Sequence, residues 1–182
     1  LYYSQYQHIS GGLTVDDIVA IDASGVEQWV WHPADHLDLP GNANGDYLHT
    51  NSEFIDDAGD LYLSWLTRDA VAKIEADRTD AAWGTPIWIM TGNGQQGDLG
   101  NDVVLDWSAV DGADSFGGQH NFHVRRDGRL MVLDNEHGRG LVLTVDDAAG
   151  TGTVDVAYET HEFACGPQGT AMDTLSGNAV VA

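Results

Sequence analysis

The feature that most constrains the fold of this chain is a repeated unit in which a polar turn leads into an apolar strand. Gly59-Asp60-Leu61-Tyr62-Leu63 has a counterpart 69 residues later in Gly128-Arg129-Leu130-Met131-Val132. A third copy, Gly177-Asn178-Ala179-Val180-Val181, follows after another 49 residues. A second apolar strand comes about ten residues after each of the first two copies, at 71–74 and 141–145. Antiparallel units that recur every 40 to 50 residues are typical of a β-propeller.

Strand patterns also dominate the rest of the chain. A turn at Ala23-Ser24-Gly25 is flanked by apolar segments at 18–21 and 28–31, which indicates a β-hairpin. Further strands are predicted at 48–55, 61–65, 70–74, 86–90 and 130–133. We expect residues 101–118 to be irregular, with at most one short helix near Trp107, and no helix of ten or more residues anywhere. The sequence therefore predicts an all-β fold.

The repeat spacing divides the 182 residues into about three and a half propeller blades. The expected blades cover residues 14–47, 48–112 and 113–163, and residues 164–182 begin another. A propeller needs about four or more blades to close. We therefore expect a partial propeller, whose missing blades come from the rest of a longer chain or from another chain.

The composition excludes several classes of partner. Seven Lys and Arg residues face 29 Asp and Glu residues, which gives a net charge of −22 at neutral pH. Nucleic acids and anionic membrane surfaces carry the same sign, so neither is expected to bind. No run of 18 apolar residues is present, and we expect no membrane insertion. The single cysteine, Cys165, can form neither an internal disulfide nor a Cys-based zinc site.

Polar side chains that could carry chemistry lie where the predicted strands begin and end. His49 and His120 each stand at the start of a strand in successive repeats, and we expect them at equivalent places. In a propeller, equivalent strand ends meet at the same mouth of the central channel. Arg68 and Asn135, which follow strands of the same two repeats, are then expected near that mouth.

An ordered series of short motifs resembles the aryl-sulfate-dependent arylsulfotransferases. The resemblance covers about residues 14–181, and the order and approximate spacing of the motifs carry it. The motifs are His49-Thr50-Asn51-Ser52, Ser64 with Arg68, Lys73-Ile74-Glu75, Trp88 with Thr91-Gly92, Gln119-His120 and Leu133-Asp134-Asn135-Glu136.

The resemblance implies a six-bladed β-propeller and a sulfuryl transfer from a phenolic sulfate ester to a phenol, without cofactor or metal. His120 corresponds to the histidine that carries the sulfuryl group as a covalent intermediate. His49 and Asn51 then contact the sulfate or the leaving group, and Arg68 clamps the sulfate. Gln119 and Asn135 complete the expected substrate site. The resemblance also implies a periplasmic or secreted protein.

Two other functions remain open from the residues. The propeller could be a binding or structural module without turnover, with His120 capping a strand and Asn51 and Asn135 forming turns. It could also be a metal-dependent lyase or hydrolase with histidines around the axis. His32 and His36 have helical spacing for a metal, whereas His120 and His123 are expected on opposite faces of a strand.

Near the mouth, Phe116, Trp65 or Tyr47 could stack on an aryl ring.

Overall fold

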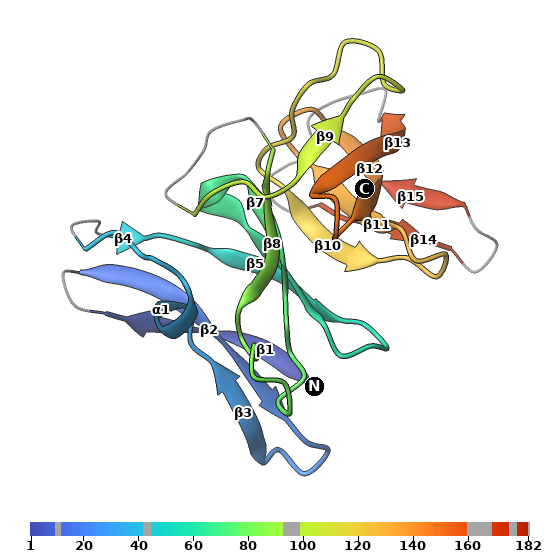
Figure 1. Cartoon of the computed structure of the whole chain (residues 1–182). Helices are drawn as coiled ribbons and strands as arrows, with labels where there is room; N and C mark the ends of the chain where they lie inside the picture. Colours follow the sequence, from blue (N-terminus) through green and yellow to red (C-terminus); the bar gives the residue numbers. More distant parts are fainter. Residues whose placement is uncertain (10–11, 42–44, 93–98, 160–168, 175–177, 182) are drawn as a thin grey trace.

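The computed structural model of the chain describes residues 1–9, 12–41, 45–92, 99–159, 169–174 and 178–181. It contains four β-sheets that follow one another along an arc (Figure 1). Among the described residues, helical structure is confined to one turn at α1 (Pro33–His36) and the 3-10 turn η1 (Leu66–Arg68). None of the helices in this part of the chain has the length and hydropathy needed to cross a lipid bilayer. The all-β prediction is confirmed.

The first sheet is built around β2 (Leu13–Ile21), which pairs antiparallel with β1 (Tyr2–His8) and β3 (Glu27–Trp31). The short strand β4 (Gly45–Asp46) pairs with β2 in parallel. The hairpin expected at residues 23–25 joins β2 to β3, and Gly25 has the positive φ of 82° that such a turn favours. The strand β1 was missed by the sequence patterns.

The second sheet is a meander of β5 (Thr50–Ile55), β6 (Leu61–Trp65), β7 (Ala70–Ile74) and β8 (Pro86–Thr91). The turn between β5 and β6 is held by Asp56, whose Oδ1 accepts hydrogen bonds from the backbone N–H groups of Ala58, Gly59 and Asp60. The strands predicted at 61–65 and 70–74 have these bounds in the structure.

The third sheet repeats this meander with β10 (His120–Val124), β11 (Leu130–Asp134), β12 (Arg139–Asp146) and β13 (Thr151–Glu159). The strand β9 (Val104–Asp106) adds to its outer edge, parallel to β13. Apart from this strand, residues 101–118 are irregular, as expected. The strand itself was missed, because residues 104–106 gain ladder hydrogen bonds from a strand 47 residues away.

The fourth sheet consists of β14 (Ala171–Asp173) and β15 (Ala179–Val181). The strand β15 coincides with the third copy of the sequence repeat. Its turn residue Gly177, like Cys165 and His161, lies outside the described residues.

The first strands of successive sheets lie side by side, as expected for propeller blades around an axis. The strands β5 and β10 are in contact, and so are β1 and β5. The backbone of Ser4 in β1 forms a hydrogen bond with the Glu53 carboxylate in β5. The blade arrangement is thus confirmed, whereas the numbers of blades in the chain and in the complete ring stay predictions.

Apolar side chains fill the spaces between neighbouring sheets. One cluster, which includes Trp31, Leu63 and Trp65, packs the first sheet on the second. Another, which includes Trp88 and Phe122, packs the second sheet on the third. Full burial of one such side chain stabilises the fold by about 1.5–3 kcal/mol. The large aromatic residues in these clusters therefore serve mainly in packing between blades.

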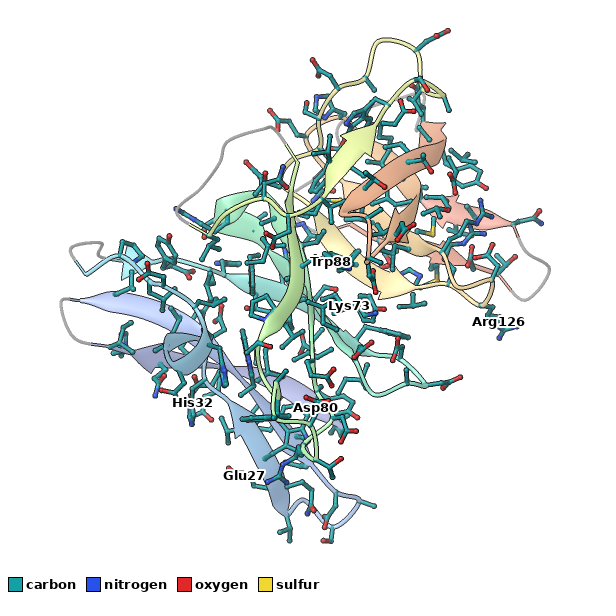
Figure 2. All side chains as sticks on the ribbon, viewed as in Figure 1. Glu27, His32, Lys73, Asp80, Trp88 and Arg126 are labelled. Atoms are coloured by element: carbon teal, nitrogen blue, oxygen red, sulfur yellow. The ribbon has the colours of Figure 1, made fainter. Side chains whose placement is uncertain are left out.

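The only lysine, Lys73, links the second and third sheets (Figure 2). Its Nζ lies 2.9 Å from an oxygen of Asp60 and 2.8 Å from Oδ2 of Asp147, in the turn after β12. The other oxygen of Asp147 accepts a hydrogen bond of 2.7 Å from Nε1 of Trp88. These contacts fix the relative position of the two blades that form the candidate site.

Candidate functional site

The loops at one end of the second and third sheets are joined by hydrogen bonds. Oδ1 of Asp69 accepts from the backbone N–H of Gly118 at 2.9 Å, and the Asp69 carbonyl accepts from Gly92 N–H at 2.7 Å. The carbonyl of Gly92 in turn accepts from the N–H of Phe116 at 3.1 Å. The segment before β10 is therefore tied to the corner between β6 and β7, and the ends of these strands form one mouth.

From this mouth a groove of about 500 Å³ runs along β5 and β10. Residues 51–54 and 120–123 line it, together with Gly169 and Met172 of the fourth sheet region. His120 is partly buried at its mouth end, with Nδ1 3.0 Å from the carbonyl oxygen of Gly118. Because a carbonyl can only accept, Nδ1 carries the proton in this contact and Nε2 keeps a lone pair.

Asn135 makes a second contact with the same ring nitrogen of His120. Its side-chain nitrogen, Nδ2, lies 2.9 Å from Nδ1. When Nδ1 carries the proton, both nitrogens are donors, so this contact is a hydrogen bond only with the amide turned to present Oδ1; the two amide orientations have nearly the same shape. Asn135 thus helps to set the orientation of the imidazole.

A buried carboxylate, Asp134, supports the turn that holds Asn135. Its side chain is fully buried and accepts from the backbone N–H of Gly117 at 3.1 Å. It also contacts Nδ1 of His137 at 2.9 Å and Nε of Arg139 at 2.8 Å. Arg139 donates further to the Ser115 carbonyl at 2.6 Å. Asp134 therefore fixes the turn after β11 against the segment that precedes His120.

Asn51 and Gln119 connect β5 and β10 at the mouth. Nδ2 of Asn51 donates to the Gln119 carbonyl at 2.7 Å. The side chain of Gln119 is fully buried, and its Nε2 donates to the carbonyls of Trp65 and Ala70, each at 3.0 Å. Gln119 thus bridges β10 to the β6–β7 corner, while Asn51 lines the groove next to His120. The expected contact of Gln119 with substrate stays a prediction.

His49 immediately precedes β5 and has a positive φ of 49°. Its Nδ1 lies 2.5 Å from Oδ2 of Asp46, and its backbone carbonyl accepts from Leu66 N–H at 3.1 Å. The Asp46 carboxylate keeps the proton on Nδ1, so Nε2 of the half-exposed ring can exchange a proton. His49 lies outside the residues that line the groove.

Arg68 ends η1 at the same mouth. Its guanidinium lies 4.3 Å from the ring centroid of Tyr47, which is a cation–π distance. Nε of Arg68 is buried without a hydrogen-bond partner in the described part of the structure. The next residue, Asp69, is the one that contacts Gly118. The loop of Arg68 is therefore tied to the segment of His120.

Buried polar side-chain atoms without a hydrogen-bond partner are concentrated at this mouth. Such atoms are rare in folded proteins, and each one calls for a functional or solvent-related explanation. In the described residues, seven of the thirteen such atoms lie here, in Asn51, Ser64, Trp65, Arg68, Thr91, Gln119 and Asn121.

The groove also contains one acidic side chain, Glu53. Burial raises the pKa of its carboxyl, and the nearby Asp16 carboxylate raises it further, against the Ser4 hydrogen bond that lowers it. The charge next to the groove therefore depends on pH over a range above the ordinary glutamate pKa.

The comparison with known families agrees with the motif series. A sequence model described as arylsulfotransferase (ASST) matches residues 4–151. The chain belongs to the arylsulfotransferase family. A search of curated proteins found no match.

Two solved structures are similar to this arylsulfotransferase-family chain over its whole length. The periplasmic gluconolactonase PpgL of Pseudomonas aeruginosa is 12% identical with a TM-score of 0.48. The virginiamycin B lyase of Staphylococcus aureus is 11% identical with a TM-score of 0.44. The chain spans 59% of the length of each of these proteins.

The strand pairing contradicts the expectation that His49 and His120 occupy equivalent places in successive blades. Phe54 pairs with Tyr62, and His123 pairs with Met131, so the two repeats share an offset of 69 residues. The counterpart of His120 in the preceding blade is therefore Asn51 or Ser52, and not His49. A bulge interrupts β5 between Thr50 and Ser52, and another interrupts β10 between His120 and His123. The sequence alone did not reveal either bulge.

One expectation about side-chain directions was also wrong, and one open possibility is not supported by the structure. His120 and His123 line the same groove, because the bulge between them interrupts the alternation of the strand. Phe116 and Trp65 are fully buried and Tyr47 is 4% exposed, so their rings are committed to the core or to Arg68. They are closed to an aryl ligand in this structure.

Metal sites are not evident where the structure is described. No group of three or more His, Cys, Asp or Glu residues in that part of the chain is arranged to hold a metal ion. Nδ1 of His32 contacts Asp17 at 2.8 Å, whereas His36 packs between the rings of Trp31 and Trp83.

Several residues of this site were not found by sequence reasoning. Asp46, Asp69 and Arg139 act through partners that are distant in sequence or belong to turns. In the sequence they cannot be distinguished from the many other charged turn residues of an acidic chain.

Proposed function

We propose that the chain forms part of an aryl-sulfate-dependent sulfotransferase in which Nε2 of His120 carries the sulfuryl group. In the first step, Nε2 forms a bond to the sulfur of an aryl sulfate and the sulfur–oxygen bond to the phenolate breaks. In the second step, a phenol oxygen bonds to the same sulfur, the nitrogen–sulfur bond breaks and the phenolic proton passes to a base. Splitting the transfer lets one site serve donor and acceptor in turn.

The observation that carries this proposal is the contact between Nδ1 of His120 and the Gly118 carbonyl. With the proton on Nδ1, Nε2 of His120 keeps its lone pair, and the His120 ring lines the groove. The family to which the chain belongs supports a transfer of this kind. A neutral imidazole with a free nitrogen is the form that can attack sulfur.

His49 is suited to the proton transfers. The phenolate that leaves in the first step takes a proton, and the acceptor phenol gives one up in the second. The Asp46 carboxylate holds the Nδ1 proton of His49, in the same way that a carboxylate orients a histidine in other acid–base pairs. Nε2 of His49 then gives a proton to the phenolate in the first step and takes one back from the phenol in the second.

Arg68 and Asn51 are suited to the sulfuryl oxygens. The transition state of such a transfer is expected to be loose, with charge on the oxygens that fixed donors stabilise. In a chain of net charge −22, a guanidinium at the mouth also offsets the field that repels a sulfate. The proposed substrates are aryl sulfates and phenols, and the family resemblance supports a periplasmic or secreted location.

The test is the release of 4-nitrophenol from 4-nitrophenyl sulfate by the full-length protein. Wild type is expected to give a burst that matches the protein concentration, followed by turnover when a phenol is added. His120→Ala is expected to abolish the burst, and metal chelators are expected to leave it unchanged. His8→Ala is the matched control, because it removes an exposed histidine that lies outside the groove. A normal burst in His120→Ala would refute the proposal.

A further inference from the structure

The groove continues beyond His120, away from the mouth. Its far part is lined by Phe54 and His123, three residues along β5 and β10 from Asn51 and His120. Three residues of extended strand span about 10 Å, and slightly less with a bulge. This length is comparable with that of one aromatic ring and a substituent in the para position.

The far part of the groove combines apolar walls with one hydrogen-bonding atom. The ring centroids of Phe54 and His123 are 6.4 Å apart, and Met172 of β14 lines the groove beside them. Aromatic and thioether side chains are favourable contacts for an aryl ring. Met172 is half-exposed, so this wall is open to a ligand.

His123 presents its ring in the same way as His120. Its Nδ1 lies 3.2 Å from the carbonyl oxygen of Asn121, two residues earlier, as Nδ1 of His120 lies near the carbonyl of Gly118. The bulge and the positive φ of 50° at Asn121 allow both rings to line one groove. Nδ1 of His123 is the donor in this contact, so its Nε2 is a hydrogen-bond acceptor.

We propose that His123 determines which phenols are used, by accepting a hydrogen bond from a neutral donor group, such as a hydroxyl, para to the reacting oxygen. This inference rests on the proposed function, since His120 marks the place of the reacting oxygen. Phe54 and Met172 contact the ring between the two ends. Glu53 in the same groove makes it unfavourable for an anionic para substituent such as a carboxylate.

The experiment compares two acceptors of similar size, 4-(hydroxymethyl)phenol and 4-ethylphenol. For each, kcat/KM is measured with 4-nitrophenyl sulfate as the donor in wild type, His123→Phe and His123→Gln. His123→Phe keeps an aromatic wall without an acceptor atom, and His123→Gln restores an acceptor. The nitrophenol burst is measured in each variant, and the affinity of both phenols is measured by ligand-observed NMR.

The ratio of kcat/KM for the hydroxymethyl compound to that for the ethyl compound is expected to fall about tenfold in His123→Phe and to recover in part in His123→Gln. The burst amplitude at saturating 4-nitrophenyl sulfate still matches the protein concentration, because it counts the molecules loaded at His120, whereas the rate of the burst can change with the contact at the para position. The NMR affinities show the same change in ratio as kcat/KM. An unchanged ratio in His123→Phe with a normal burst would overturn the role of His123 and leave the proposed function intact. Absence of a burst in wild type would instead refute the proposed function, and the NMR affinities alone would then decide the role of His123.

Discussion

Nδ1 of His120 lies 2.9 Å from the side-chain amide of Asn135, so the turn after β11 orients a ring at the start of β10. The same nitrogen lies 3.0 Å from the Gly118 carbonyl. Two separate segments therefore determine the tautomer and the direction of one imidazole.

Substitution of Asn135 is expected to slow the chemical step without weakening substrate binding. Loss of one hydrogen bond costs about 0.5–1.5 kcal/mol, so Asn135→Ala should lower the burst rate constant about threefold to tenfold. Asn135→Asp keeps an acceptor for the Nδ1 proton and should remain close to wild type. Stopped-flow measurement of nitrophenol release tests both variants. If Asn135→Asp loses as much as Asn135→Ala, Nδ1 does not carry the proton.

Gln119 is expected to stabilise the junction of the two blades. Gln119→Leu leaves the carbonyls of Trp65 and Ala70 buried without their donor, which should lower the free energy of unfolding by about 2–4 kcal/mol. Gln28→Leu is the matched control, because the exposed Gln28 also donates two hydrogen bonds. That change should stay within about 0.5 kcal/mol. Urea unfolding compares the two variants, and equal effects would contradict the bridging role of Gln119.

Glu53 should make the affinity for aryl sulfates depend on pH. Burial raises the pKa of its carboxyl, so below that raised pKa the group is protonated and neutral. As pH rises through it, the carboxylate forms and repels the sulfate, and KM should rise. Glu53→Gln should remove this rise and lower KM about threefold to tenfold at neutral pH. Measurement of KM from pH 5 to 8 tests this, and the prediction fails if wild type and variant share one profile.

Lys73 should contribute to stability rather than to catalysis. Lys73→Met keeps the apolar stem but leaves Asp60 and Asp147 without their shared cation. The free energy of unfolding should fall by about 1–3 kcal/mol, while the burst amplitude per folded molecule is unchanged. Arg78→Met, at an exposed hydrogen bond to the Gln28 carbonyl, provides the control. A smaller effect of Lys73→Met than of this control would argue against the link between blades.

The sequence predicted those parts of the fold that depend on local chemistry. The strands at 61–65 and 130–133 were predicted because each follows a polar turn with a glycine, and Gly59 and Gly128 adopt positive φ in the structure. The second strand ends one residue later than predicted, at Asp134. The parallel pairing of β9 with β13 was not found, since it depends on contacts between residues distant in sequence.

The candidate site was predictable in its residue types and less so in its geometry. His120 and Asn51 line one groove, and Asn135 contacts His120, in line with the motif series. The bulges that determine which side chains share the groove depend on long-range contacts. One such contact joins Ser52 Oγ to the backbone of Phe122, 70 residues away. For this reason Asn51 or Ser52, and not His49, is the counterpart of His120.

The most direct test of the central claim is to locate the sulfuryl group after reaction with an aryl sulfate in the absence of an acceptor. The full-length protein is quenched under alkaline conditions, digested and analysed by tandem mass spectrometry, with His123→Ala as a control that retains His120. The account predicts one sulfuryl group, on His120, in both proteins, and its loss when a phenol is added. A sulfuryl group on another residue, or an unlabelled His120 in protein that releases nitrophenol, would contradict it.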